Sequence, residues 1–404
     1  MSQNIMIVGG NFDNKGAQSM LFITIDEIKK RIPEARIFFA SEDRIEFPEF
    51  KFIKIFASSD AKKIALNQNC LYTICKRSVM DLIKRIIGRR DNLLKFNDLK
   101  NIIPQIDLII DISGFNLGKK WSKDIQESYL DNIRIAKKYN IPIVLMPQSF
   151  GPFDYPDENR HILYEIEELL PYARKIYARE KEGYNMLTDI FHLKNVDLST
   201  DLVLQNSGIN IENIYLNPTK KSVLQIGDNA VGIVPNAQCF KHGNKVRILD
   251  IYRQIIKTLL EQEKRIYVFR HSSEDVEVCK EIYDLFPDKL ELINNDFSCL
   301  EYDEFVKQFD FLICSRYHGI VHAFRNGIPS ILLGWAIKYF ELASHVNQDK
   351  YVFNITDLNM DVKGLLNAVN LLCKNHDKES VIIKKKLELI QSNNCFNSLS
   401  EWMK

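Results

Sequence analysis

Several features are absent from this 404-residue sequence, and each absence excludes a class of protein. No stretch approaches the roughly 20 apolar residues that span a bilayer. The first residues, MSQNIMIVGG, lack the basic and apolar regions of a signal peptide. These absences predict a cytoplasmic protein, with at most peripheral contact at the inner face of a membrane.

An excess of charge of one sign is also absent. The 54 Lys and Arg residues are balanced by 53 Asp and Glu residues, so no overall field attracts nucleic acid. The basic triplet Lys384 to Lys386 is interpreted as a solvated helix face. Nucleic acid is therefore not an expected partner.

Cysteine motifs are missing as well. The eight cysteines are scattered and form no C-x-x-C pair, so neither a zinc ribbon nor a redox motif is indicated. Their dispersion fits reduced, buried thiols in a cytosolic protein. We expect no metal and no cofactor.

The phosphate-binding glycine motifs are absent from the N-terminal loop. An apolar strand at 5–8 ends in Gly9 and Gly10, and a helix is predicted from Ser19 to Arg31. Strand, glycine loop and helix are the opening unit of a nucleotide-type α/β domain. The loop contains neither G-x-G-x-x-G nor a P-loop motif, which argues against a dinucleotide or P-loop site.

Strands and helices alternate along the rest of the chain, which predicts two α/β domains with parallel sheets. The first domain is expected at 1–210, with a helical insertion at about 60–101. Residues 205–222 lose periodicity and are interpreted as the link. The second domain is expected at 222–378, and a lysine-rich helix near 379–392, in a segment 379–404, is expected to return to the first domain. Two Rossmann-like domains facing across a cleft are a GT-B-like architecture.

The most informative stretch is residues 309–341, which predicts a strand, a helix and a second strand. Arg316 and His318 fall at the strand-to-helix switch, where ligands of parallel sheets bind. With the free N–H groups of a helix start, Arg316 suits an anion and His318 can move protons. The alternative is an interdomain ion pair at Arg316 and a hydrogen-bonded core histidine at His318.

Other polar residues at strand ends have two interpretations each. Arg179 can complete an anion clamp or form a structural ion pair, and His271 is a second candidate acid or base. Lys338 and Glu341 can face the cleft or pair with each other. Gln148 and Ser149 can bind sugar hydroxyls or stabilise a turn. His322 and Cys314 are interpreted as packing residues.

Taken together, the motifs resemble the polysaccharide pyruvyl transferase family. The matching segments are GNFDNKGAQSML from residue 10, DISGF at 111–115, MPQSFGPF at 146–153, YARE at 177–180, TDLVL at 200–204, GIVPN at 232–236, and SRYHGIVHAFRNGIPSILLGWAIKYFEL at 315–342. Many members have Gly-Asp after the first glycine-rich loop, where this chain has Asn14 to Gln18.

The resemblance implies a GT-B-like enzyme that transfers a pyruvyl group from phosphoenolpyruvate to a saccharide and forms a pyruvate ketal in a surface polysaccharide. It places the co-substrate phosphoenolpyruvate against catalytic Arg316 and His318, with Arg179 and Lys338 as further donor contacts. The expected acceptor contacts are Asn11, Asn14, Gln148, Ser149, Asn236, His271 and Glu341.

Two alternatives remain: a GT-B glycosyltransferase using a sugar nucleotide, and a non-catalytic protein of the polysaccharide pathway. The acceptor sugar, its nucleotide or lipid carrier and the oligomeric state, including a homo-oligomer, stay open.

Overall fold

The structure is a computed structural model that describes residues 3–43, 46–68, 95–219 and 222–403. Most of the predicted helical insertion, residues 69–94, lies outside the described residues. On either side of it the chain forms α2 (Ser59–Leu66) and α4 (Lys95–Ile102).

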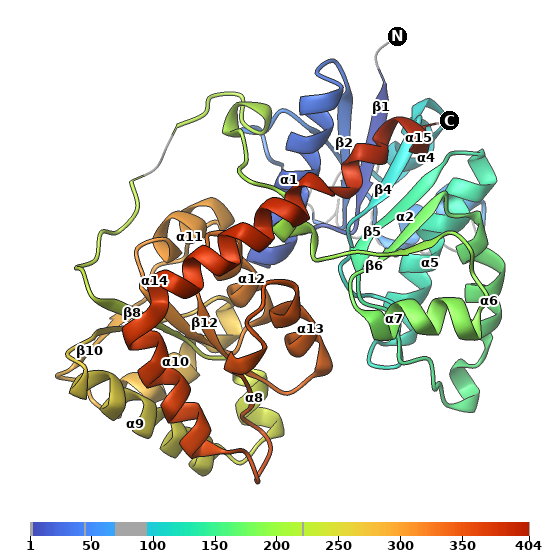
Figure 1. Cartoon of the computed structure of the whole chain (residues 1–404). Coiled ribbons are helices and arrows are strands. Elements are labelled where there is room, and N and C mark those ends of the chain that lie inside the picture. Colours follow the sequence, from blue (N-terminus) through green and yellow to red (C-terminus); the bar gives the residue numbers. More distant parts are fainter. Residues whose placement is uncertain (1–2, 44–45, 69–94, 220–221, 404) are drawn as a thin grey trace, which may run out of the picture.

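The N-terminal part of the chain forms a seven-stranded parallel sheet in the order β3-β2-β1-β4-β5-β6-β7. One face is covered by α1 and the other by α2, α4, α5 and α6, so the central strands are apolar on both sides (Figure 1). The strands are β1 (Asn4–Val8), β2 (Arg36–Ser41), β3 (Ile53–Phe56), β4 (Leu108–Asp111), β5 (Ile143–Gln148), β6 (Lys175–Ala178) and β7 (Val196–Leu198); the helices are α1 (Lys15–Arg31), α5 (Lys123–Tyr139), α6 (His161–Leu169) and α7 (Lys181–Asn185).

The C-terminal part forms a six-stranded parallel sheet in the order β10-β9-β8-β11-β12-β13. Residues of α9, α10 and α14 pack on one face, and residues of α11, α12 and α13 pack on the other. The elements are β8 (Ala230–Val234), α8 (Ala237–His242), α9 (Lys245–Glu261), β9 (Arg265–Phe269), α10 (Val276–Tyr283), β10 (Leu290–Ile293), α11 (Cys299–Val306), β11 (Phe311–Cys314), α12 (Tyr317–Arg325), β12 (Ser330–Gly334), α13 (Ile337–His345), β13 (Val352–Asn354), α14 (Val362–Ser392) and α15 (Leu399–Trp402).

These two parallel α/β sheets confirm the predicted pair of Rossmann-like domains. Helix α1 begins at Lys15, four residues before the predicted start, because the Asn14 side chain accepts hydrogen bonds from the Gly16 and Ala17 amides. None of the helices in the described residues is long and apolar enough to cross a membrane.

The last long helix differs more from its prediction. The helix expected near 379–392 is the second half of α14, which begins at Val362 and is capped by Asp361. Leu365, Val369 and Leu372 bury one face of its first half against the second domain. The chain then reaches the first domain, where α15 lies beside the first sheet (Figure 1). There Trp402 lies edge-on to Tyr177 of β6, with ring centroids 6.0 Å apart.

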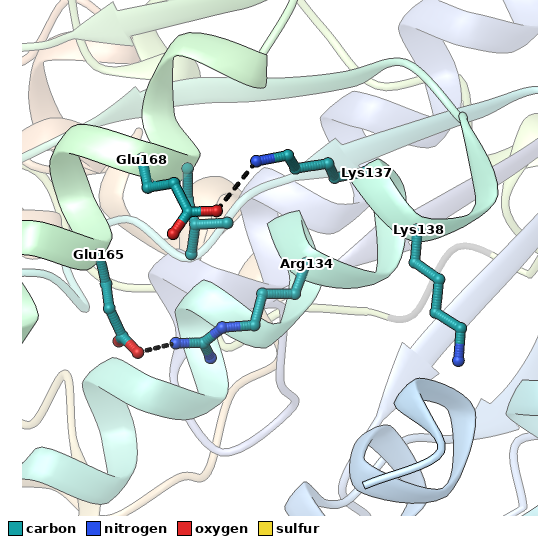
Figure 2. A pocket seen from close by; sticks show the side chains of 6 residues that line it. Arg134, Lys137, Lys138, Glu165 and Glu168 are labelled. Carbon is teal, nitrogen blue, oxygen red and sulfur yellow. Dashed lines mark hydrogen bonds and ion pairs between the residues drawn. The ribbon is translucent and has the colours of Figure 1, made fainter.

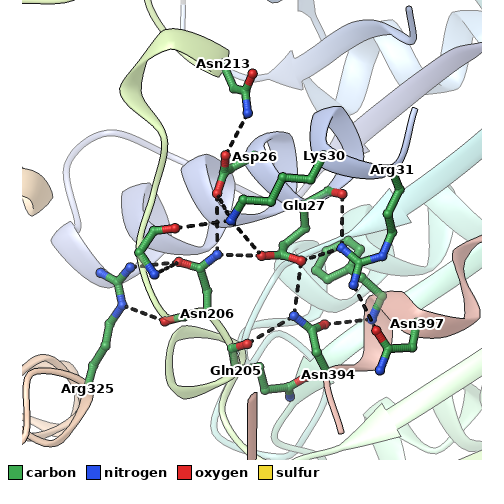
Figure 3. Close-up of polar contacts among 12 residues, drawn as sticks. Asp26, Glu27, Lys30, Arg31, Gln205, Asn206, Asn213, Arg325, Asn394 and Asn397 are labelled. Atoms are coloured by element: carbon green, nitrogen blue, oxygen red, sulfur yellow. Dashed lines mark hydrogen bonds and ion pairs between the residues drawn. The ribbon is translucent and has the colours of Figure 1, made fainter. Parts of the chain in front are cut away.

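A polar network joins α1, the interdomain link and the C-terminal segment (Figure 3). Buried Glu27 accepts hydrogen bonds from Asn206 at 2.6 Å, Arg31 at 2.5 Å and Asn394 at 3.2 Å. Asn206 also accepts a bond at 2.9 Å from Arg325 of α12. Three segments distant in sequence are thereby fixed around one carboxylate.

We predict that Glu27→Gln lowers the free energy of unfolding by about 1–3 kcal/mol at pH 7, since the amide NH2 that replaces one carboxylate oxygen would face a donor and the charge that pairs with Arg31 would be lost. Burial tends to raise the pKa of Glu27, but the bonds from Arg31 and Asn206 outweigh it and lower the pKa. A carboxyl with a lowered pKa stabilises the fold above its unfolded pKa and loses that contribution as the pH falls through the folded one.

Denaturant melts of wild type and variant should therefore converge as the pH falls below about 4.5, the ordinary value of a glutamate. Glu304→Gln is the control, because Glu304 pairs with the exposed Lys307 at the surface. A constant difference between the melts at all pH values would contradict the assignment.

Candidate active site

The carboxyl edges of the two sheets meet at the start of α12. A Cβ atom built on Gly16 of α1 would lie 2.2 Å from Cγ of His318, so the backbone of α1 rests against the imidazole. Farther along the same edges, Glu341 of α13 accepts a 2.6 Å bond from the Lys181 amide at the start of α7. Two predicted site residues of the second domain, His318 and Glu341, are thus brought against the first domain.

His318 is half-buried as the second residue of α12, and its Nε2 has no hydrogen-bond partner among the described residues. Burial, and next the charge of Arg179, lower the pKa of His318 well below its usual value. The imidazole is therefore neutral at physiological pH, with a buried ring nitrogen available for proton transfer.

His271 follows β9 and lies beside His318. The two rings are nearly parallel, with an interplanar angle of 15° and centroids 6.5 Å apart. Burial and the neighbouring histidines also lower the pKa of His271 well below its usual value. Its carbonyl accepts a 3.1 Å bond from buried Lys15 of α1, a residue that the sequence interpretation overlooked.

Arg316 forms an ion pair, but with two carboxylates of its own domain and not across the domains as the alternative to anion binding expected. Its Nε donates to Asp275 at 2.7 Å and its Nη2 donates to Asp275 at 2.5 Å and to Glu274. Asp275 is fully buried, so the pair is well shielded. These carboxylates fix the guanidinium at the N-cap of α12, where no side chain caps the helix amides.

Arg179 is likewise in ion pairs, at 2.9 Å from Glu180 and 3.1 Å from Asp201, and its side chain is almost fully buried. Its guanidinium carbon lies 4.7 Å from the ring centroid of Tyr317. Lys338 of α13 places its ammonium 5.0 Å from the same ring. Tyr317 was not predicted as a site residue, although it stands between Arg316 and His318 in the motif.

Lys338 differs from the two arginines because it forms no ion pair within the described part of the chain. Burial, and next the charge of Arg179, lower the pKa of Lys338 to about 8. A cation held near others without a carboxylate partner is poised to bind an anion. The predicted pairing of Lys338 with Glu341 does not form, since Glu341 bonds across to Lys181.

Three of the remaining predicted acceptor contacts use their side chains in hydrogen bonds within the protein. Ser149 donates to Glu180 at 2.8 Å and accepts from Arg179 at 3.0 Å, so it supports the arginine. Asn14 caps α1, and Asn236 caps α8 while donating to the Ser315 carbonyl at 3.2 Å.

Two other predicted acceptor contacts, Gln148 and Asn11, differ from these three. Gln148 is fully buried, and neither polar atom of its amide has a hydrogen-bond partner among the described residues. Asn11 accepts from the Asn14 amide at 3.0 Å and lines a pocket at the edge of the first sheet.

His322 and Cys314 occupy the packed interior. His322 bonds Asp303 through Nδ1 at 2.7 Å and lies 3.3 Å from the Ser19 hydroxyl through Nε2. Burial raises the pKa of the Cys314 thiol. In the described residues no three His, Cys, Asp or Glu side chains are arranged to hold a metal ion.

A charged pocket of about 300 Å³ lies far from this site, between α5 and α6 (Figure 2). Two of its cations are engaged in ion pairs, Arg134 with Glu165 at 2.5 Å and Lys137 with Glu168 at 3.1 Å. Lys138 donates to the Ala65 carbonyl at 2.9 Å. This pocket is therefore a surface ion-pair cluster.

Comparison with solved structures defines the class of fold. The chain is similar to UDP-GlcNAc 2-epimerase from Methanocaldococcus jannaschii, with a TM-score of 0.55 and 12% identity over 92% of this chain and 93% of that one. It is also similar to a mutant of TarM from S. aureus in a complex with UDP, with a TM-score of 0.55 and 10% identity over 99% and 98% of the chains. The arrangement is that of GT-B glycosyltransferases and epimerases, and at these identities the likeness concerns the fold alone.

The sequence identifies the family more closely. The family model described as polysaccharide pyruvyl transferase matches residues 14–336, most of the chain. The chain belongs to the polysaccharide pyruvyl transferase family. No curated protein matches the sequence.

We predict that Gly16→Ala destabilises the protein by about 1–3 kcal/mol, because the added methyl group overlaps the His318 ring and forces packed groups apart. Gly208→Ala is the matched control, since a Cβ atom there meets nothing within 4 Å. Thermal melts compare the two variants, and the histidine resonances of His318 report any displacement of the ring. Equal melting temperatures with an unchanged His318 signal would contradict the close contact.

Proposed function

We propose that the protein transfers the pyruvyl group of phosphoenolpyruvate to a saccharide and forms a cyclic ketal. Family membership supports pyruvyl transfer, and the observation that carries the donor assignment is the cluster of Arg179, Lys338 and His318 around Tyr317. Phosphoenolpyruvate carries a carboxylate and a phosphate, and such anions are bound by cations and by helix N-termini.

Two helix starts supply amide donors beside these residues. The N-caps of α12 and α13 make no side-chain hydrogen bond, so the first N–H groups of both helices are not capped by those side chains. Lys338 and His318 sit in the first turns of α13 and α12. We assign phosphoenolpyruvate to this corner, with Lys338 as the cation available for the anion and Arg179 and Arg316 as charges fixed by their carboxylates.

The chemistry needs protons moved in a defined order. A proton adds to the methylene carbon, which becomes the methyl group and leaves an oxocarbenium-like centre at the neighbouring carbon. One sugar hydroxyl attacks that carbon and loses its proton, phosphate departs, and a second hydroxyl closes the ring and loses its own proton. One of these protons replaces the one added to carbon, and the other leaves with phosphate.

His318 is suited to these transfers because it is neutral in the empty site and therefore able to accept a proton from a hydroxyl. A bound phosphate beside it would favour the protonated ring, which can then return the proton. His271, stacked against His318, is positioned to stabilise the orientation of the ring.

We predict phosphate release from phosphoenolpyruvate that requires a saccharide acceptor, and a pyruvylated product visible by mass spectrometry. His318→Ala should lower kcat by about 10²–10⁴-fold, the usual contribution of an acid–base group. His242→Ala, which removes an exposed histidine of α8, is the control and should retain full activity. Normal turnover by His318→Ala would disprove its role, and binding of a sugar nucleotide without any binding of phosphoenolpyruvate would favour a glycosyltransferase.

The Lys338 ammonium gives a second prediction. With a pKa of about 8, Lys338 is charged below that pH and loses its charge above it. The Kd for phosphoenolpyruvate should therefore rise above pH 8, by at most about tenfold per pH unit. Calorimetric titration should show a smaller rise for Lys338→Arg, since a guanidinium keeps its charge. The same pH profile in both proteins would exclude Lys338 as the titrating contact.

A further inference from the structure

A pocket of about 430 Å³ lies at the carboxyl edge of the first sheet, within the size range of small-molecule sites. Three acidic side chains line it, Glu42, Asp43 and Asp124, together with serine and asparagine side chains and Trp121. Its lysine, Lys62, is engaged with Ser128, donating to the carbonyl at 2.8 Å and the hydroxyl at 3.0 Å. The pocket is therefore polar and acidic, in contrast to the cationic corner around Lys338.

The segment 113–121 connects this pocket to the cationic corner. A Cβ atom on Gly118 would lie 2.4 Å from the Gly151 carbonyl oxygen, so the segment is held tightly against the turn that follows β5. Ser113 and Trp121 line the pocket. Lys120 lies near enough to Lys338 for its charge to help lower the pKa of that lysine. One short segment thus lines the acidic pocket through Trp121 and lies near the donor corner through Lys120.

Two buried donors of the pocket have unused hydrogen-bonding capacity. The Trp121 indole nitrogen has no partner among the described residues, and the Tyr129 hydroxyl, on a residue that is 2% exposed, has beside it only the amide of Gln148, with which it makes no well-aligned hydrogen bond. Buried polar groups are normally satisfied, so unpartnered ones in a pocket wall indicate a bound ligand or water.

Trp121 is half-buried and held in place. Its amide donates to the Gly118 carbonyl at 3.0 Å, its carbonyl accepts from Gln126 at 3.0 Å, and its ring lies edge-on to Phe115. A fixed, partly exposed indole presents a flat apolar face.

We propose that this pocket binds the acceptor as an uncharged saccharide unit, an inference that rests on the proposed pyruvyl transfer. Carboxylates accept hydrogen bonds from sugar hydroxyls, the Tyr129 hydroxyl and the indole N–H can bond ring and hydroxyl oxygens, and the C–H face of a sugar packs on Trp121. Three carboxylates repel a phosphate. The helices that start here, α2 and α5, already carry Asp60 and Asp124 in their first turns.

The test uses methyl glycosides of glucose, galactose, mannose and N-acetylglucosamine, each compared with its 6-phosphate. Binding to the full-length protein is followed by saturation-transfer NMR. At least one uncharged glycoside should bind the wild type, and its 6-phosphate should bind at least tenfold more weakly. Trp121→Ala should raise the Kd of the glycoside about tenfold. Tyr164→Ala, which removes an aromatic side chain that is 69% exposed on α6, is the control and should leave the Kd unchanged.

Asp43→Asn combined with Asp124→Asn should reduce the preference for the uncharged glycoside. Phosphoenolpyruvate binding, measured by calorimetry, should be the same in the pocket variants and the wild type. No binding by any glycoside, equal binding of the phosphates, or a Kd unaffected by Trp121→Ala would each overturn the proposal. Glycoside binding that depends on Trp121 in a protein that fails to bind phosphoenolpyruvate would instead keep the saccharide pocket and refute the pyruvyl donor.

Discussion

The contact between Gly16 and His318 is the constraint on which the rest of the site depends. The first turn of α1 touches the imidazole without space for a side chain, and the Asn14 cap ensures that the helix starts there. This contact sets the separation of the two sheets at their carboxyl edges. It also excludes water from one face of the ring, and burial is the main reason that His318 is neutral.

The arrangement of charged side chains around this contact reflects the free-energy cost of burying an ion without a partner. Arg179 and Arg316 are each held by two carboxylates, since a buried guanidinium without partners would be strongly destabilising. The two arginines thereby become part of a rigid frame. In the proposed site the anion would therefore bind at the groups that the frame leaves available, which are Lys338, His318 and the helix amides.

The sequence predicted the sheets well because parallel strands are short apolar runs with polar ends. The strand predicted at 5–8 lies within β1, and the strand, helix and second strand predicted within 309–341 are β11, α12 and β12. Only the second half of helix α14 was predicted. Its lysines gave a clear helical pattern near 379–392, whereas the first half is amphipathic and carries few charges. The family was also recognisable from the sequence, because its motifs occur in order along most of the chain and the last of them, at 315–342, is long.

The partners of the site residues were beyond prediction. Asp275 lies 41 residues from Arg316, and nothing in the pattern near either residue indicates their ion pair. The same holds for Tyr317, whose ring lies between Arg179 of one domain and Lys338 of the other domain. Such contacts depend on how two domains are placed, which periodicity does not encode. The acidic pocket was missed for a similar reason, since its walls come from distant segments of the first domain.

Helix α14 has a mechanical consequence. Its 31 residues form one continuous helix that bends between a first half packed along α9 and a second half that leads toward α15 against the first sheet (Figure 1). A rotation of one domain relative to the other must therefore change this bend or displace the second half of α14, where Ile383 and Leu387 are buried. Helix α14 and the link near Asn206 both connect the two domains, so any relative movement of the domains has to be accommodated in these two segments.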